Sequence, residues 1–247
     1  MEPKILLLVF CLTTTCFAQK SKPIEADRPD QTETPAIVPK GMFQAETGFT
    51  FQKNNLQNQS WNLPSTLWKY GLNENLEVRL ITELVYEKTN DEKSFGLSPV
   101  WIGFKVRLCE ESGLIPKTSF IGHMSLPHAA SSNFKKDFSA PEFRFTMQHT
   151  LSDKMTLGYN LGCEWDGITP LPTYVYTLTT GLAVTDKLGI YTEVFGFASQ
   201  AESANHNLDG GMTYLITDNF MVDLSSGVGL TDIAPEYYFA LGFSFRY

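Results

Sequence analysis

The chain has 247 residues, with 27 acidic and 19 basic side chains and a formal net charge of −8. This acidic balance and the lack of a basic patch argue against nucleic acid as a partner. No apolar run approaches the roughly 18 residues that a transmembrane helix needs, so a helical membrane protein is excluded.

The N-terminus has the pattern of a secretory signal peptide. A lysine precedes the apolar run from Ile5 to Leu12, and the small-residue exit CFAQ places cleavage after Ala18. A buried N-terminal strand or helix is the alternative. Removal of the signal leaves Cys109 and Cys163, which provide no disulfide framework. We therefore predict three parts: a signal peptide (1–18), an irregular segment (19–41) and one large β domain (42–247).

The segment 19–41 shows no alternation of apolar and polar residues. Its prolines preclude regular secondary structure. One interpretation is a disordered periplasmic leader. The other is an ordered segment that enters the following domain as a plug and pairs with charges there. The residues of this plug motif are Asp27, Arg28, Pro29 and Asp30.

Short and long connections alternate along the rest of the chain. Tight turns of polar residues recur between apolar residues: LNENL from Leu72, CEESGLIPK from Cys109, LSDKM from Leu151, VTDKL from Val184 and ITDNF from Ile216. Longer polar connections lie between them: 54–60, 88–96, 127–139, 167–172, 199–207 and 231–236. Six long and five short connections separate twelve predicted strands, with both ends of the domain on the short-turn side.

The predicted strands have one apolar and one polar face. The third strand places Val78 and Leu80 on one face, and Glu77 and Arg79 on the other. The runs are ten to thirteen residues long, which matches a tilted strand that crosses a bilayer. Apolar residues outside and charges inside are typical of a membrane barrel. We predict an all-β fold, a transmembrane antiparallel β-barrel of about 12 strands, with a secreted sandwich as the alternative.

The inward face of this barrel is predicted to carry nearly balanced charges. Such balance favours a network of ion pairs and low ion conductance over an ion-selective pore. Any solute path would run past these residues: Glu46, Lys69, Glu77, Arg79, Glu83, Lys105, Arg107, Glu142, Arg144, Glu164, Glu193, Asp223 and Arg246.

The chain ends on the alternating stretch YYFALGFSFRY, from Tyr237 to Tyr247. This last strand must pair with the first, because an open edge in lipid would leave backbone groups unsatisfied. Its terminal aromatic residue resembles the C-terminal signature of bacterial outer-membrane barrels, which the assembly machinery reads. The expected partners are therefore outer-membrane lipid and lipopolysaccharide, the barrel-assembly machinery and a small solute.

The stretch that leads from the irregular segment into the β domain carries a more specific resemblance. The stretch DRPDQTETPAIVPKGMFQAETGFTF from Asp27 resembles the opening of the phenol-degradation meta-pathway family of outer-membrane proteins, often labelled transporters. The repeated turns and the aromatic C-terminus agree with it. The resemblance implies a barrel in the outer membrane of a Gram-negative bacterium, and the movement of small aromatic or hydrophobic molecules.

Three function classes follow, of which a porin-like transporter or channel is preferred. The alternatives are a non-conducting structural or interaction barrel and, third, an outer-membrane hydrolase. His149 lies near Ser152 and Asp153, but nothing there assembles a nucleophile with an oxyanion hole. His123 and His128 lack metal-ligand spacing. We therefore expect no enzymatic activity, no metal and no cofactor.

The alternation of connections predicts that both termini face the periplasm. Single cysteines introduced at Asn58, Asp91 and Ser203, in the long connections, should react with a membrane-impermeant reagent on intact cells. Cysteines in short turns, at Asp153 and Asp186, should react only after cells are opened. Labelling of the short-turn positions on intact cells would invert the topology.

Overall fold

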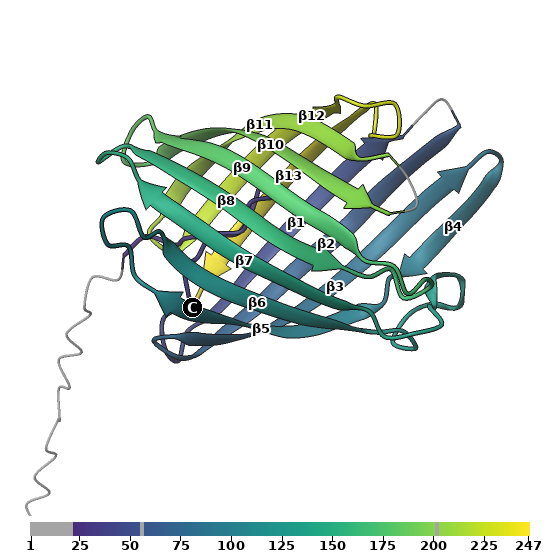
Figure 1. The fold of residues 1–247 in the computed structure, drawn as a ribbon, viewed down its shortest axis with the longest axis horizontal. Helices are drawn as coiled ribbons and strands as arrows, with labels where there is room; N and C mark the ends of the chain where they lie inside the picture. The colour runs from purple at the N-terminus through teal and green to yellow at the C-terminus, as the bar shows by residue number, and fades with distance from the viewer. Residues whose placement is uncertain (1–21, 55–56, 201–202) are drawn as a thin grey trace, which may run out of the picture.

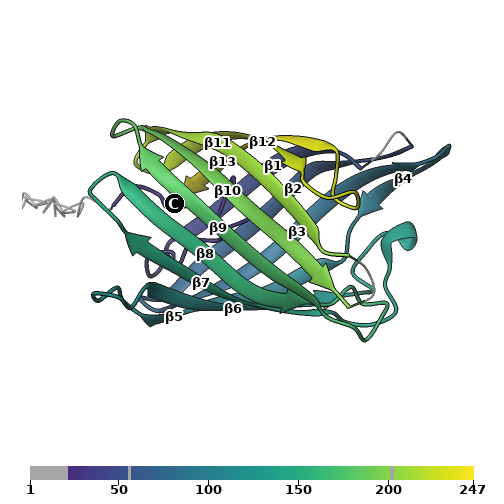
Figure 2. The same ribbon diagram turned by 45° about the horizontal axis from the view of Figure 1, so that its top comes forward.

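The computed structural model describes residues 22–54, 57–200 and 203–247. The predicted signal peptide lies outside them. Strands in the described residues form one antiparallel sheet that rolls into a barrel (Figures 1 and 2). They are β1 (Phe43–Lys53), β2 (Asn58–Asn73), β3 (Leu76–Thr89), β4 (Glu92–Leu97), β5 (Val100–Cys109), β6 (Lys117–Leu126), β7 (Pro141–Thr150), β8 (Met155–Glu164), β9 (Thr173–Ala183), β10 (Leu188–Ser199), β11 (Asn205–Thr217), β12 (Phe220–Gly229) and β13 (Tyr237–Arg246).

The barrel wall is closed by the pairing of its first and last strands. β1 and β13 pair antiparallel from Gln44 opposite Arg246 to Lys53 opposite Tyr237. β3 pairs with both β2 and β5, so β4 stands outside the closed ring. The wall of twelve strands confirms the predicted barrel, and β4 is one further strand. No helix in the described part of the chain is long and apolar enough to cross a membrane.

The two faces of each strand differ as the alternation predicts. On β3, Val78 and Leu80 are 41% and 37% exposed on the outer surface, whereas Glu77 and Arg79 are 0% and 3% exposed inside. Apolar side chains are stable in contact with lipid, whereas lipid cannot solvate charges. The charged side chains must therefore lie inside the barrel. The interior of this protein is therefore polar.

The hairpin of β3 and β4 corrects the predicted long connection 88–96. Residues in this range continue β3 to Thr89 and form β4, joined through a turn in which Asn90 has a φ of 57°. Asparagine tolerates this left-handed conformation, which two-residue hairpins require. The hairpin projects past the barrel rim at the end with the long connections (Figure 1). Outside the bilayer neither face of a strand needs to be apolar, so its sequence resembled that of a loop.

Two other predicted loops are shorter than expected. β2 begins at Asn58 and β11 begins at Asn205, so polar residues at both places already belong to strands. His206, which we expected in a loop, lies in β11 and contacts the Tyr176 hydroxyl through Nδ1 at 2.5 Å. The connection between β6 and β7 stays irregular as predicted, with one short 3-10 helix, η1 (Ser132–Phe134).

The end of the chain is held in the closing seam. The Phe43 amide donates to the Tyr247 carbonyl and the Tyr247 amide donates to the Phe43 carbonyl, both at 2.8 Å. The Phe43 and Phe245 rings lie 6.3 Å apart. The last residue thus contributes two of the backbone hydrogen bonds that close the barrel.

Shortening this seam should impair insertion into the membrane. Deletion of Tyr247 removes both bonds, and replacement of Phe245 and Tyr247 by serine weakens the lipid-facing side of β13. We expect normal secretion but a reduced yield of barrel that shows heat-modifiable mobility on gels. Leu114→Ser, in an exposed turn, is the control and should insert normally. Normal yield from both seam variants would contradict the prediction.

Candidate functional site

The N-terminal residues 22–41 lie inside the barrel, as the purple segment in Figure 1 shows. The segment is held near the short-turn end at both of its own ends: the Ile24 amide donates to the Asp218 carbonyl at 2.8 Å, and the Gly41 amide to the Gly71 carbonyl at 2.8 Å. Between these points it contacts strands from opposite sides of the wall. We call residues 22–41 the inner segment.

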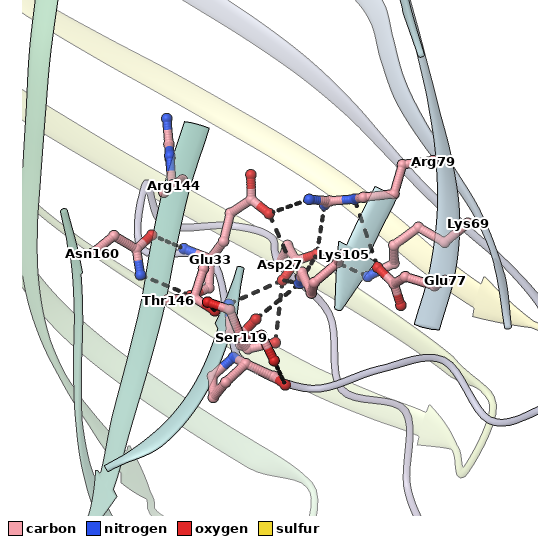
Figure 3. A network of polar contacts seen from close by, with 12 residues as sticks. Asp27, Glu33, Lys69, Glu77, Arg79, Lys105, Ser119, Arg144, Thr146 and Asn160 are labelled. Carbon is pink, nitrogen blue, oxygen red and sulfur yellow. Dashed lines mark hydrogen bonds and ion pairs between the residues drawn. The ribbon is translucent and has the colours of Figure 1, made fainter. Parts of the chain in front are cut away.

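Asp27 is the centre of the largest charge cluster. Its carboxylate accepts hydrogen bonds from Lys69 Nζ at 2.9 Å, Arg79 Nη2 at 2.8 Å and Lys105 Nζ at 2.8 Å (Figure 3). These bases come from β2, β3 and β5, and Asp27 is only 4% exposed. Burial alone would raise the pKa of Asp27, but Lys105, Lys69 and Arg79 outweigh it and hold the pKa well below its usual value. One carboxylate of the inner segment therefore pairs with three inward bases.

Carboxylates of the wall complete the cluster. Glu46 Oε2 accepts from the backbone amides of Asp27 at 2.8 Å and Arg28 at 3.1 Å, and Glu46 also pairs with Lys69. Glu77 Oε2 accepts from the Val38 amide at 2.8 Å. The wall thus binds both charges and backbone groups of the inner segment.

Arg28 crosses the closing seam to reach Asp223 on β12. Its Nη2 donates to Asp223 Oδ1 at 2.8 Å and its Nε to Oδ2 at 3.3 Å. The guanidinium passes over Gly48 and Gly242, which face each other across β1 and β13. A Cβ atom at either glycine would collide with it, so only glycine leaves space for this pair.

Glu33, which no sequence pattern singled out, extends the network across the barrel. Its carboxylate accepts from Arg79 Nη1 at 2.6 Å, and its backbone amide and carbonyl bind the Asn160 side chain at 2.8 and 3.0 Å. Arg144 donates to the Gln31 carbonyl at 3.2 Å, and Ser119 to the Pro35 carbonyl at 2.8 Å. Asn160 and Ser119 are small polar residues that point inward. They carry no charge, so a search for charged inward residues does not find them.

The opposite side of the interior is acidic. Glu193 on β10 accepts from the Gln31 amide at 2.8 Å and from the Thr32 hydroxyl at 2.5 Å. Asp209 lies directly opposite Glu193 on β11, and Asp30 lies close to both. Burial and the charge of Glu193 raise the pKa of Asp30 well above its usual value. None of the three carboxylates forms an ion pair with a base among the described residues.

Asp209, an inward residue of β11 that was not among the predicted site residues, is buried and bound by two tyrosine hydroxyls. It is 4% exposed, and its Oδ2 accepts from the hydroxyls of Tyr191 at 3.4 Å and Tyr238. Its Oδ1 is buried and has no hydrogen-bond partner within the part of the chain that the structure describes. The interior is therefore divided into a charge-balanced side at β2, β3 and β5 and an acidic side at β10 and β11.

Two cavities lie beside residues 28–30 of the inner segment. Each has a volume of about 390 Å³, and Arg28, Pro29 and Asp30 line both of them. One opens between short turns, with Lys154 and Ala183 in its wall. The other lies at the long-connection end, with Gln52 and Pro235. Residues 28–30 thus lie between the two cavities.

Nine of the thirteen predicted inward residues are at most 6% exposed: Glu46, Lys69, Glu77, Arg79, Lys105, Arg144, Glu193, Asp223 and Arg246. The other four are partly exposed. Glu83 accepts from Asn62 at 2.7 Å, and Arg107 pairs with Glu110 at 2.8 Å beside a short turn. Glu142 and Glu164 lie 2.9 and 4.0 Å from Arg144. The structure brings Lys69, Arg79 and Lys105 together, mainly through the inner segment rather than through direct pairs across the barrel.

A family model described as "Putative MetA-pathway of phenol degradation" matches residues 26–247. The chain belongs to this family. The resemblance predicted from the segment at Asp27 is thereby confirmed. No curated protein is significantly similar to this family member in sequence.

Solved outer-membrane proteins share the fold of this member of the phenol-degradation family. The COG4313 outer membrane channel from Pseudomonas putida F1 aligns with a TM-score of 0.66 and 10% identity, covering 89% of this chain and 99% of the channel. The KdgM porin aligns with a TM-score of 0.54 and 10% identity, covering 82% and 98%. The NanC porin aligns with a TM-score of 0.54 and 8% identity, covering 82% and 98%. The fold is therefore that of Gram-negative outer-membrane channels.

Disrupting the Asp27 cluster should destabilise this family member strongly. Arg79→Ala leaves Asp27, Glu33 and Glu77 without their shared partner, and loss of one member of a buried ion pair costs about 3–5 kcal/mol. Urea unfolding in lipid vesicles, followed by tryptophan fluorescence, measures the loss. Lys93→Ala, on the exposed hairpin, is the control. A loss of unfolding free energy below about 1 kcal/mol would contradict the prediction, because exposed ion pairs contribute that little.

Proposed function

We propose that the protein is an outer-membrane channel for small molecules, in which the inner segment closes the pore to free diffusion. The observation that carries this proposal is the position of residues 28–30 between two cavities at opposite ends of the barrel. A segment that filled the interior completely would leave no such spaces. The names of the COG4313 channel and the KdgM porin support the same class of function.

The proposal gives the two sides of the interior different roles. The Asp27 cluster anchors the inner segment to β2, β3 and β5. The solute passes on the other side, beside Asp30, Glu193 and Asp223. In this assignment some of the predicted inward residues anchor the inner segment and others line the solute path. Most of the bases belong to the first group.

A non-conducting barrel is the second candidate function. The density of ion pairs inside supports it: Asp27 alone has three cationic partners, which makes release of the inner segment costly. In that case the long connections and the β3–β4 hairpin would be the functional surface. Solute uptake distinguishes the two candidates.

We further propose that the protein has no catalytic activity. The side chain of His123 contacts Glu142, and that of His149 contacts Tyr159 and Glu111. Among the described residues, no histidine side chain has a hydrogen bond to a serine or cysteine, as a nucleophile–base pair would need. Assembly through the barrel machinery and contact with lipopolysaccharide also belong to this proposal, supported by the terminal Tyr247 and the apolar outer face.

Removal of the inner segment tests the channel proposal. Full-length mature protein should show low conductance in planar bilayers and slow, size-limited swelling of liposomes. A variant without residues 19–38 should conduct several times more while it keeps heat-modifiable mobility. Equal conductance of the two proteins would show that the inner segment does not close the pore.

A cross-link separates passage beside the inner segment from its displacement. The hydroxyls of Thr32 and Thr177 lie 2.6 Å apart, so Thr32→Cys with Thr177→Cys, in a background without Cys109 and Cys163, can form a disulfide. Swelling rates should be the same before and after reduction if solutes pass beside the segment. No swelling with any solute, in either state, would favour the non-conducting barrel.

A further inference from the structure

The cavity at the long-connection end has a distinct lining. Its walls include the side chains of Phe195, Phe197 and Tyr238, and Asp30 lies at its inner end. The amides of Gln52 and Asn207 complete the polar part. Its volume of about 390 Å³ falls in the range of small-molecule sites. The cavity therefore combines aromatic rings with a carboxylate.

The aromatic part is a fixed wall. The Phe195 and Phe197 rings lie 6.0 Å apart at an angle of 85°, and Phe195 is 6% exposed. The Tyr238 hydroxyl is engaged by Asp209, which holds the ring in place. The faces of aromatic rings attract cations through their quadrupole, more strongly where water is excluded.

The groups around the cavity are mostly acidic. Arg28 also lines it, but its guanidinium is held by both oxygens of Asp223. Asp30 has no basic partner among the described residues, and Glu193 and Asp209 lie close to it. One guanidinium thus stands among four carboxyl groups, and a positively charged ligand can stabilise their ionised forms.

We propose that this cavity binds a small organic ammonium ion, with its charge at Asp30 and its apolar substituent against Phe195 and Phe197. The assignment deepens the proposed function, on which it rests for its relevance to transport, by giving the channel a solute class. A neutral or anionic molecule of the same size lacks the attraction to the carboxylates. A bound ammonium ion also favours the ionised form of Asp30, which burial beside Glu193 disfavours.

Binding is measured by calorimetry on the full mature protein in detergent, with three probes of nearly equal size: phenethylammonium, 2-phenylethanol and phenylacetate. Phenethylammonium should bind at least about tenfold more tightly than the other two. Asp30→Asn should weaken its binding about tenfold, and Phe197→Leu about threefold. Asp232→Asn, in an exposed loop, and Phe143→Leu, on the lipid face, are matched controls and should bind like the parent protein.

Equal affinity for the three probes would overturn the proposal, as would unchanged binding by a folded Asp30→Asn variant. Heat-modifiable mobility establishes that each variant is folded, and Asp30→Glu should retain binding if the charge is what matters. Liposome swelling with the same probes separates this inference from the channel proposal. Swelling without preference for the ammonium ion would contradict this inference alone. Selective binding without any swelling would contradict the transport function alone.

Discussion

In hydrocarbon every backbone amide and carbonyl needs a partner within the protein, and the rest of this structure depends on that constraint. It requires β1 to pair with β13 along their length, and it forces the strands to alternate between lipid and interior. Charged side chains such as Arg79 and Lys105 can then lie only inside, where they are fully buried. Buried bases need carboxylates nearby. The inner segment supplies the central one, Asp27, so closure of the barrel and occupation of its interior are linked by charge.

The same argument explains why the interior is uneven. Bases are concentrated on β2, β3 and β5, where Asp27 and Glu33 approach them. On β10 and β11 the wall carries carboxylates, and the inner segment presents backbone amides, a threonine and one more acid. The segment is therefore held tightly at Asp27 and Glu33, and it leaves cavities beside residues 28–30. Cavities and a dense network of ion pairs therefore occur in the same interior.

The period-two pattern was sufficient to predict the barrel, the strand count of its wall and the inward position of residues such as Glu77 and Lys105. It failed at β4, because a hairpin outside the lipid has no apolar face to reveal it. It also could not select Glu33, Asn160 or Asp209 as interior partners. Their roles depend on where the inner segment crosses the barrel. The sequence of that irregular segment does not show which strand residues it will contact. Asp209 does occupy an inward position of β11, beside Asn207, so the alternation of that strand contained a signal for it.

Arg28 has a consequence for the order of assembly. Its binding place consists of Gly48 on the first strand, Gly242 on the last and Asp223 on the strand before it. These three positions come together only when the two ends of the sheet have met. The inner segment, although it is made first, has no complete docking place until the final strand is paired. Complete docking of the inner segment therefore requires a closed barrel. A sheet that closed in the wrong register would leave Arg28 without its carboxylate partner.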